Sequence, residues 1–122
     1  MATPVLASFI DRQAEAFERA FAEDPFISLR SFLPGTSHPQ YIEVLTELIR
    51  IDLELSWRRN ECRRLQYYLN EFPLLSENQH AYERVAFEEY RQRRILGEHV
   101  TPNDYAKAHG IQPNLWPPIR MT

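Results

Sequence analysis

The stretch LTELIRIDLELSWRRNECRRLQYYLNEFPLL, residues 45–75, decides the fold of this chain. Its first half places apolar residues at mixed three- and four-residue spacings, and together they cover more than half of a helix surface. So wide an apolar arc predicts a long helix over residues 39–59 that packs against neighbours on two sides. After an arginine-rich turn, a second and shorter apolar pattern predicts a helix over residues 63–71.

The chain on either side of this stretch repeats its organisation. A shift of 37 residues aligns it with the C-terminal third, in the pairs Asp52–Glu89, Asn60–Gly97, Glu61–Glu98 and Tyr68–Tyr105. A shift of 36 residues aligns it with the N-terminal third, in the pairs Phe17–Leu53, Phe21–Trp57 and Phe32–Tyr68. A period in the mid-thirties is typical of stacked helical pairs, although amphipathic helices also resemble one another by chance. We therefore expect an all-α fold of about six helices, in three degenerate units that each contain a long helix, a tight turn and a short helix.

The remaining helices are expected at residues 5–23, 28–33, 78–96 and 102–109, packed as a compact bundle or as stacked pairs. Residues 1–111 then form a single helical domain, and residues 112–122 form an extended, proline-rich tail. The side chains expected to be substantially buried are Leu48, Leu55, Trp57, Tyr68, Leu69 and Tyr90.

Composition narrows the range of functions. The 122 residues include only three glycines, which stand far apart, so the sequence lacks the glycine-rich phosphate loops of nucleotide-binding enzymes. A formal net charge of −3 offers no general attraction to nucleic acid or to anionic lipid. The sequence has neither an apolar run of membrane-spanning length nor the basic start of a secretory signal. Its single cysteine, Cys62, cannot form an intrachain disulfide, so we expect a cytoplasmic protein with no membrane partner.

No residue pattern predicts catalysis, a metal site or a cofactor. The four histidines lack the spacing of zinc ligands, and the serines lack the G-x-S-x-G elbow of hydrolases. Cys62 lies among arginines that favour a reactive thiolate, but no histidine lies nearby in sequence to act as its base. We interpret it as a small residue in a solvated turn, and we expect a protein that is not an enzyme.

Two acidic residues, Asp52 and Glu89, interrupt the apolar faces of their helices. A carboxylate in such a position must be paired or protonated, because an unpaired buried charge costs several kcal/mol. We expect each acid to bind an arginine of an adjacent turn or helix and so to fix the register between units. The candidate partners are Arg58, Arg59, Arg63 and Arg64 after the first acid and Arg91, Arg93 and Arg94 after the second, and of these Arg58, Arg59 and Arg93 are named as anchors. The alternative is a role in binding a ligand or in catalysis.

Basic runs at residues 57–64 and 91–94, and a pattern at 100–111 like the start of a helix-turn-helix, raise the question of DNA binding. The prolines that follow prevent a recognition helix at that place. The arginines are better explained as last-turn residues that complement helix dipoles and pair with acids. We therefore expect no nucleic-acid partner.

The tail interleaves Leu115, Trp116 and Ile119 with three prolines. Proline pre-sets an extended backbone, and an apolar tryptophan is not left in water without reason. The tail either packs over the last helical pair as a terminal cap or binds a partner through these three residues. Its poverty in glycine and serine favours the cap.

Three stretches of the sequence together resemble a known family. The stretch 45–75, with ISLRSFLPG (27–35) before it and EEYRQRRILGEHVTPNDYAKAHG (88–110) after it, is similar to the helical region ahead of the catalytic domain in planctomycete-type serine/threonine protein kinases. That region typically reads LLxELIxIDLExRWRRGExPxxExYLxRFP in its central element. This chain has Asn60-Glu61 where the family has Gly-Glu, and Ala108-His109-Gly110 where the family repeats Arg-Phe-Pro, so the geometry of these turns stays open.

The resemblance implies a role beside a kinase rather than as one, because the chain lacks the kinase motifs themselves. It implies a noncatalytic interaction or regulatory module of bacterial signalling, whose partner is a serine/threonine kinase domain or its regulator. The alternative is a small adaptor subunit of another complex with no kinase link. A DNA-binding protein is the weaker alternative.

Overall fold

The computed structural model describes residues 8–113, 116 and 117, and every regular element among them is a helix. The long helices are α1 (Phe9–Glu23), α2 (Tyr41–Arg58) and α5 (Gln79–Ile95). The short elements are the 3₁₀ helix η1 (Leu29–Phe32), α3 (Leu65–Glu71), α4 (Leu74–Glu77) and α6 (Pro102–His109). The all-α fold is confirmed, with bounds that differ from the predicted ones by a few residues. No helix of the described residues is long and apolar enough to cross a membrane.

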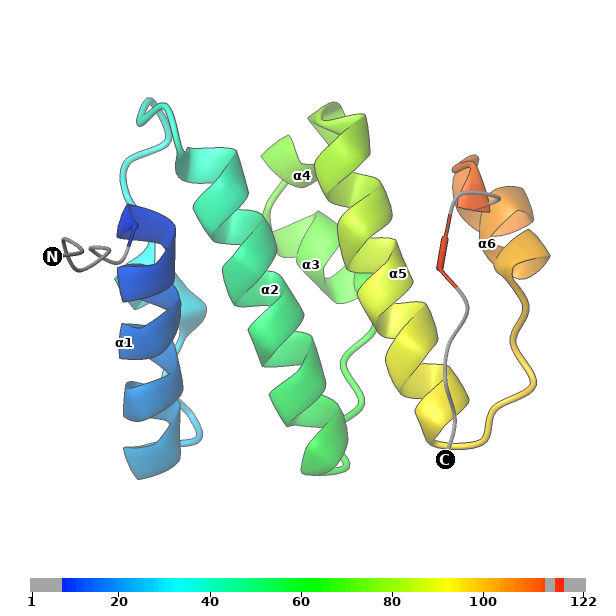
Figure 1. Cartoon of the computed structure of the whole chain (residues 1–122), viewed down its shortest axis with the longest axis horizontal. Helices are drawn as coiled ribbons and strands as arrows, with labels where there is room; N and C mark the ends of the chain where they lie inside the picture. Colours follow the sequence, from blue (N-terminus) through cyan, green and yellow to red (C-terminus); the bar gives the residue numbers. More distant parts are fainter. Residues whose placement is uncertain (1–7, 114–115, 118–122) are drawn as a thin grey trace, which may run out of the picture.

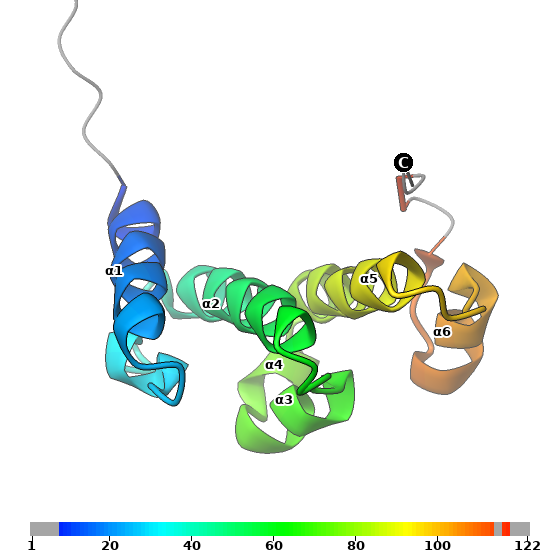
Figure 2. The same ribbon diagram turned by 90° about the horizontal axis from the view of Figure 1, so that it is seen from below.

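Three parallel helices form one layer of the molecule. α1, α2 and α5 lie side by side and run in the same direction, so their C-terminal ends share one edge (Figure 1). α2 is the central helix and packs against both α1 and α5. η1, α3 and α4 lie on one side of this layer, and α6 lies at the far end of the row beyond α5 (Figure 2). Each long helix is thus followed by a short returning element, as the alignment of three units predicts.

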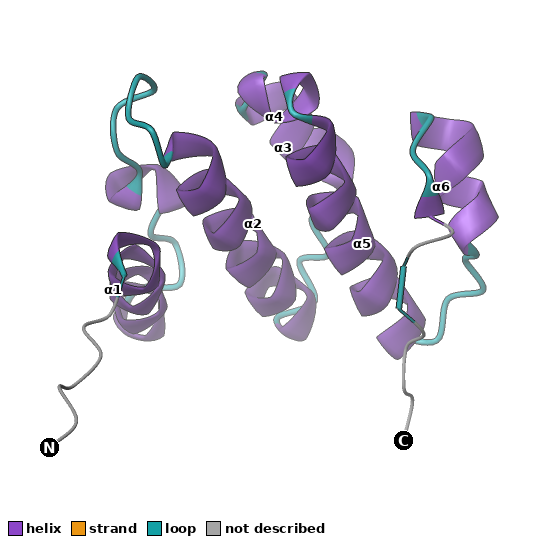
Figure 3. Ribbon diagram, turned by 45° about the horizontal axis from the view of Figure 1, so that its top comes forward, coloured by secondary structure: helices purple, strands orange, loops and turns teal. Residues whose placement is uncertain are grey.

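The helix ends follow from local chemistry. Ser8 and Asn78 accept hydrogen bonds from the first turns of α1 and α5 through their side chains. Thr101 and Asp104 form a reciprocal capping box at the start of α6, with Pro102 in the first turn. Only α4 is missing from the prediction, because a single turn between Pro73 and Asn78 leaves no periodic pattern. Short loops connect the other helices (Figure 3).

The turns after α2 and α5 have the same hydrogen bonds. The Asn60 amide donates to the Trp57 carbonyl and the Glu61 amide to the Ser56 carbonyl, and residues 97 and 98 repeat both bonds 37 positions later. This is the Schellman arrangement, which needs a left-handed residue after the helix. Asn60 (φ 63°) and Gly97 (φ 96°) supply it. Asn60 thus takes the same position in its turn as Gly97 does, because asparagine tolerates this conformation.

The short helices of the second and third units end differently. α3 is followed by Phe72, whose ring is buried and lies against the Arg30 guanidinium. α6 is followed instead by Gly110, a left-handed residue with φ of 64°, and His109 stacks on Tyr105.

The core lies between the long-helix layer and the short elements. Leu48, Trp57 and Tyr68 are buried as predicted. Leu55, Leu69 and Tyr90 are partly buried, and Leu69 and Tyr90 pack against the core from its edge. Leu55 lies near the C-terminal end of α2, at the margin of its apolar arc. Tyr90 packs in an aromatic cluster near the surface.

Candidate functional site

Asp52 sits in the middle of α2 with 2% of its surface exposed. Its Oδ2 accepts a hydrogen bond of 2.5 Å from the Tyr68 hydroxyl and one of 2.7 Å from Nη1 of Arg63. Burial, reinforced by the Asp52 carboxylate, raises the pKa of Tyr68 far above its ordinary value. Tyr68 therefore stays a protonated donor, and these three residues form a closed internal brace.

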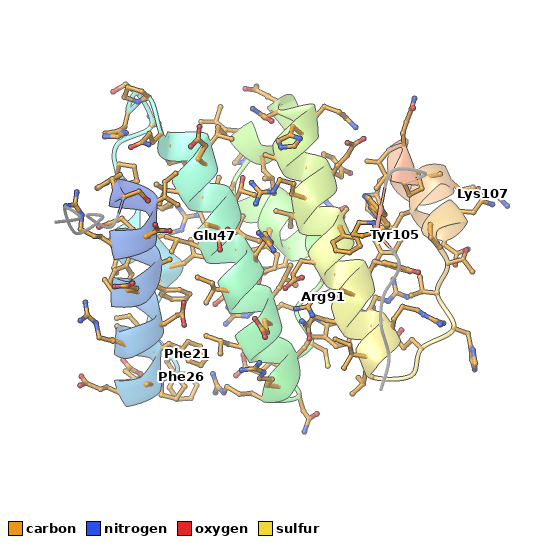
Figure 4. All side chains as sticks on the ribbon, in the orientation of Figure 1. Phe21, Phe26, Glu47, Arg91, Tyr105 and Lys107 are labelled. Atoms are coloured by element: carbon orange, nitrogen blue, oxygen red, sulfur yellow. The ribbon has the colours of Figure 1, made fainter. Side chains whose placement is uncertain are left out.

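Glu89 holds the aligned position in α5 and is also buried. Its Oε1 accepts a hydrogen bond of 2.5 Å from the Tyr105 hydroxyl, and its Oε2 accepts one from the backbone amide of Leu65. Arg93 lies 3.7 Å from the carboxylate and also donates to the Tyr105 hydroxyl. Burial and the Glu89 charge raise the pKa of Tyr105 above its ordinary value. Tyr105 lies between α5 and α6 (Figure 4). Because Leu65 belongs to the preceding unit, Glu89 joins two units directly.

The two acid–tyrosine pairs correspond through the internal repeat. In each pair the tyrosine follows the acid by 16 residues, and the pairs are 37 residues apart. The first unit has Ala16 and Phe32 at the positions aligned by the shift of 36. There the Phe32 ring packs on the Phe17 ring with centroids 5.6 Å apart. The acid and the phenol hydroxyl are therefore absent together in that unit.

Asp52 binds an arginine of the adjacent turn, as expected, but neither Arg58 nor Arg59, the two named as anchors, is that arginine. Arg58 is exposed and pairs with Glu54 one turn earlier on α2. Arg59 pairs with Glu61 and donates to the carbonyl of Pro25. The partner is Arg63, because the chain reverses in the turn after α2 and returns past the helix. Only Arg93, of the three named arginines, lies beside a buried acid.

Sequence reasoning missed a third buried acid, Glu88. It is 3% exposed, and both of its carboxylate oxygens accept hydrogen bonds from Arg91, at 2.9 and 3.1 Å. The three-residue spacing of Glu88 and Arg91 is the signal that could have found it.

The tail places Trp116 against the last unit. Its ring lies 5.3 Å from those of Phe87 and Tyr90 and 5.5 Å from that of Tyr105, measured between centroids. This is the position of a cap over α5 and α6. Leu115 and Ile119, the other two residues named for partner binding, lie outside the described residues.

Titratable groups elsewhere in the described chain form no reactive constellation. No cluster of three metal-ligating side chains occurs among residues 8–113, 116 and 117. The Nδ1 of His109 lies 2.8 Å from the Tyr82 hydroxyl, and burial lowers the pKa of the imidazole. Cys62 is half-buried in the turn after α2, with a φ of 49°. Every buried side-chain nitrogen and oxygen in the described part of the chain has a hydrogen-bond partner.

Most of the exposed apolar groups lie along one edge of the molecule. We call the shared C-terminal end of α1, α2 and α5 the turn edge, formed by residues 24–27, 58–62 and 95–98 (Figure 1). Among the described residues the exposed large apolar side chains are Phe26, Tyr67, Ile95 and Leu96, with exposed fractions from 44% to 81%. All but Tyr67 lie on the turn edge. Isolated apolar residues on a surface are ordinary, but a group of them indicates a contact surface.

Chemically, the buried acids are already occupied by hydroxyl, amide and guanidinium donors, and the tyrosines beside them are poor nucleophiles. The arrangement is suited to holding each short helix against its long helix and to joining the second and third units, rather than to acid–base chemistry. No family model, curated protein or solved structure matched the chain.

Proposed function

We propose that this chain is a noncatalytic helical module that binds a protein partner. The observation that carries the proposal is where its polar and apolar side chains lie, inside the molecule or on its surface. The buried polar groups satisfy one another, while Phe26, Ile95 and Leu96 stay exposed on the turn edge. Such a distribution supports a binding role, because exposed apolar side chains that neighbour one another are typical of contact surfaces.

We further propose that the partner is a serine/threonine kinase domain or a regulator of one, in cytoplasmic bacterial signalling. The support for this is the residue pattern of 45–75 and 88–110, which resembles the accessory region of planctomycete-type kinases. In such an arrangement the partner performs the chemistry, and this module positions or regulates it.

The test is affinity purification of the full chain from a lysate of the cells that express it, followed by quantitative mass spectrometry. We expect enrichment of a protein with a kinase domain, and a shift of both proteins to one peak in size-exclusion chromatography when they are mixed. Enrichment of a complex without a kinase would replace this proposal with the adaptor alternative. Turnover in a hydrolase and transferase panel that is lost in Asp52→Asn or Glu89→Gln would overturn the noncatalytic assignment.

A further inference from the structure

The turns after α2 and α5 share their backbone but differ in two side chains. Arg58-Arg59 at the end of α2 aligns with Ile95-Leu96 at the end of α5. Since the hydrogen bonds and the left-handed residue are the same in both turns, the fold itself accepts either pair. An exposed Ile-Leu pair is therefore not required by the turn.

Arg59 closes the space between the first two turns. Its Nη1 donates to the Pro25 carbonyl at 2.8 Å, and its guanidinium lies 5.4 Å from the ring centres of both Phe21 and Phe26. Both rings lie at the C-terminal end of α1, beside the end of α2 (Figure 4). Arg59 thus fills this space with its guanidinium, which lies over both rings and is held by the Pro25 carbonyl.

At the aligned position Leu96 leaves the corresponding space open. A groove of about 220 Å³ lies there, which we call the turn groove, lined by Trp57, Arg58, Asn60, Gln92, Ile95 and Leu96. Ile95 is 52% exposed and Leu96 is 56% exposed. This volume is below the usual size of a small-molecule pocket, and it suits one or two apolar side chains of a larger partner.

The surroundings of the groove are cationic. The Arg58 side chain is 67% exposed, and the Arg64 side chain is 52% exposed with its guanidinium 5.3 Å from the Trp57 ring centre. Their acid partners, Glu54 and Glu98, are less exposed, at 34% and 33% of the side chain. The charges that reach furthest into solvent beside the apolar groove are therefore the two guanidinium groups.

We propose that the turn groove binds an acidic amphipathic helix of a protein partner, an inference that rests on the proposed function. An apolar stripe at i, i+3 and i+4 spacing would enter between Ile95, Leu96 and Trp57, and glutamates beside the stripe would face Arg58 and Arg64. A second copy of this chain is the poorer occupant, because a two-fold contact would bring the same arginines against each other. A phosphate backbone is also a poorer occupant, because the centre of the groove is apolar.

The test uses two synthetic 20-residue helical peptides with the same leucine stripe, one flanked by glutamate and the other by lysine. Each is titrated into the ¹⁵N-labelled full chain, and the indole N–H of Trp57 and the side-chain amide of Gln92 report on the groove. We expect the glutamate peptide to shift these signals and those of residues 95 and 96. Its affinity should fall as the salt concentration is raised. We expect the lysine peptide to bind at least tenfold more weakly.

The decisive variant is Ile95→Arg/Leu96→Arg, which copies the pair that α2 already carries. It should keep the parent melting temperature and lose at least tenfold in affinity for the glutamate peptide. The control is Tyr67→Ser, which removes an exposed apolar side chain of α3 that lies off the turn edge and should bind like the parent.

Equal binding of the two peptides, shifts confined to other surfaces, no shift at millimolar peptide, or a double variant that binds like the parent would each overturn the inference. A dimer seen by sedimentation and abolished by the double variant would assign the groove to a second copy instead. Capture from lysate separates the two proposals. A partner held equally by the parent and the double variant would leave the proposed function standing and remove this site, whereas a parent that captures no partner would remove the function.

Discussion

Replacing Asp52 with alanine is expected to destabilise the protein by about 2–4 kcal/mol. The substitution removes the acceptor of the Tyr68 hydroxyl, and a buried donor left without a partner costs about 1–3 kcal/mol. It also removes the partner of Arg63, whose side chain is 35% exposed, so water replaces part of that interaction. The total should therefore be smaller than the cost of breaking a fully buried ion pair, which is about 3–5 kcal/mol, or should match only the lower part of that range.

The first unit, with Ala16 and Phe32, suggests the control. Tyr68→Phe alone should cost about 1–2 kcal/mol, and Asp52→Ala/Tyr68→Phe should cost less than the sum of the single variants, because the hydroxyl that Asp52→Ala orphans is then gone. We expect a coupling of about 1 kcal/mol or more. Asp52→Asn should fall between the parent and Asp52→Ala, because the amide oxygen still accepts one hydrogen bond.

The assay is urea unfolding followed by circular dichroism at 222 nm, with the slope and the midpoint fitted for all four members of the cycle. Free energies that add to within about 0.3 kcal/mol would refute the argument, since they would mean that Tyr68 and Asp52 do not depend on each other. An unchanged midpoint in Asp52→Ala would show that the carboxylate is solvated.

Three further outcomes are expected. Gly97→Ala should lower the free energy of unfolding by about 1–2 kcal/mol because its φ of 96° disfavours a side chain, whereas Asn60→Gly should change it little; equal losses in the two variants would contradict the shared turn geometry. Burial lowers the pKa of folded His109, so the unfolded chain takes up the proton first as the pH falls below about 6.5; the melting temperature should drop with falling pH, and less steeply in His109→Gln. Trp116→Ala should destabilise the protein by about 1–2 kcal/mol through loss of the aromatic cluster, and a parent whose Trp116 emission matches free tryptophan would remove the cap.

The helices were predictable because their apolar spacing is a property of the sequence alone, and so was the three-unit order, because alignment of the chain with itself needs no structure. The burial of Asp52 follows from its position on the apolar face of the helix, among the leucines. The identity of its arginine partner does not follow from the helical pattern. Arg58 and Arg63 lie on either side of the same turn, and only the left-handed conformations at Asn60 and Cys62 bring Arg63 back toward the helix.

The second buried acid shows a different limit of sequence reasoning. Glu89 was expected to connect units through an arginine, and the group it reaches across the unit boundary is the backbone amide of Leu65. Every residue except proline carries such an amide, so no residue type marks this donor in the sequence. The donor is available because Leu65 begins α3, where the first amides of a helix lack partners within it.

One methylene accounts for the difference between the two acid sites. Both acids bind the tyrosine 16 residues later, which fixes one carboxylate oxygen of each. The longer glutamate extends its other oxygen to the preceding unit and binds the start of α3. The shorter aspartate binds Arg63 from its own unit through the oxygen that accepts from Tyr68. Glu89→Asp should therefore break the contact with Leu65 while keeping Tyr105, and hydrogen exchange of the Leu65 amide should accelerate more than that of the α5 amides. Uniform acceleration across α5 would show that Glu89 stabilises its own helix rather than the junction between units.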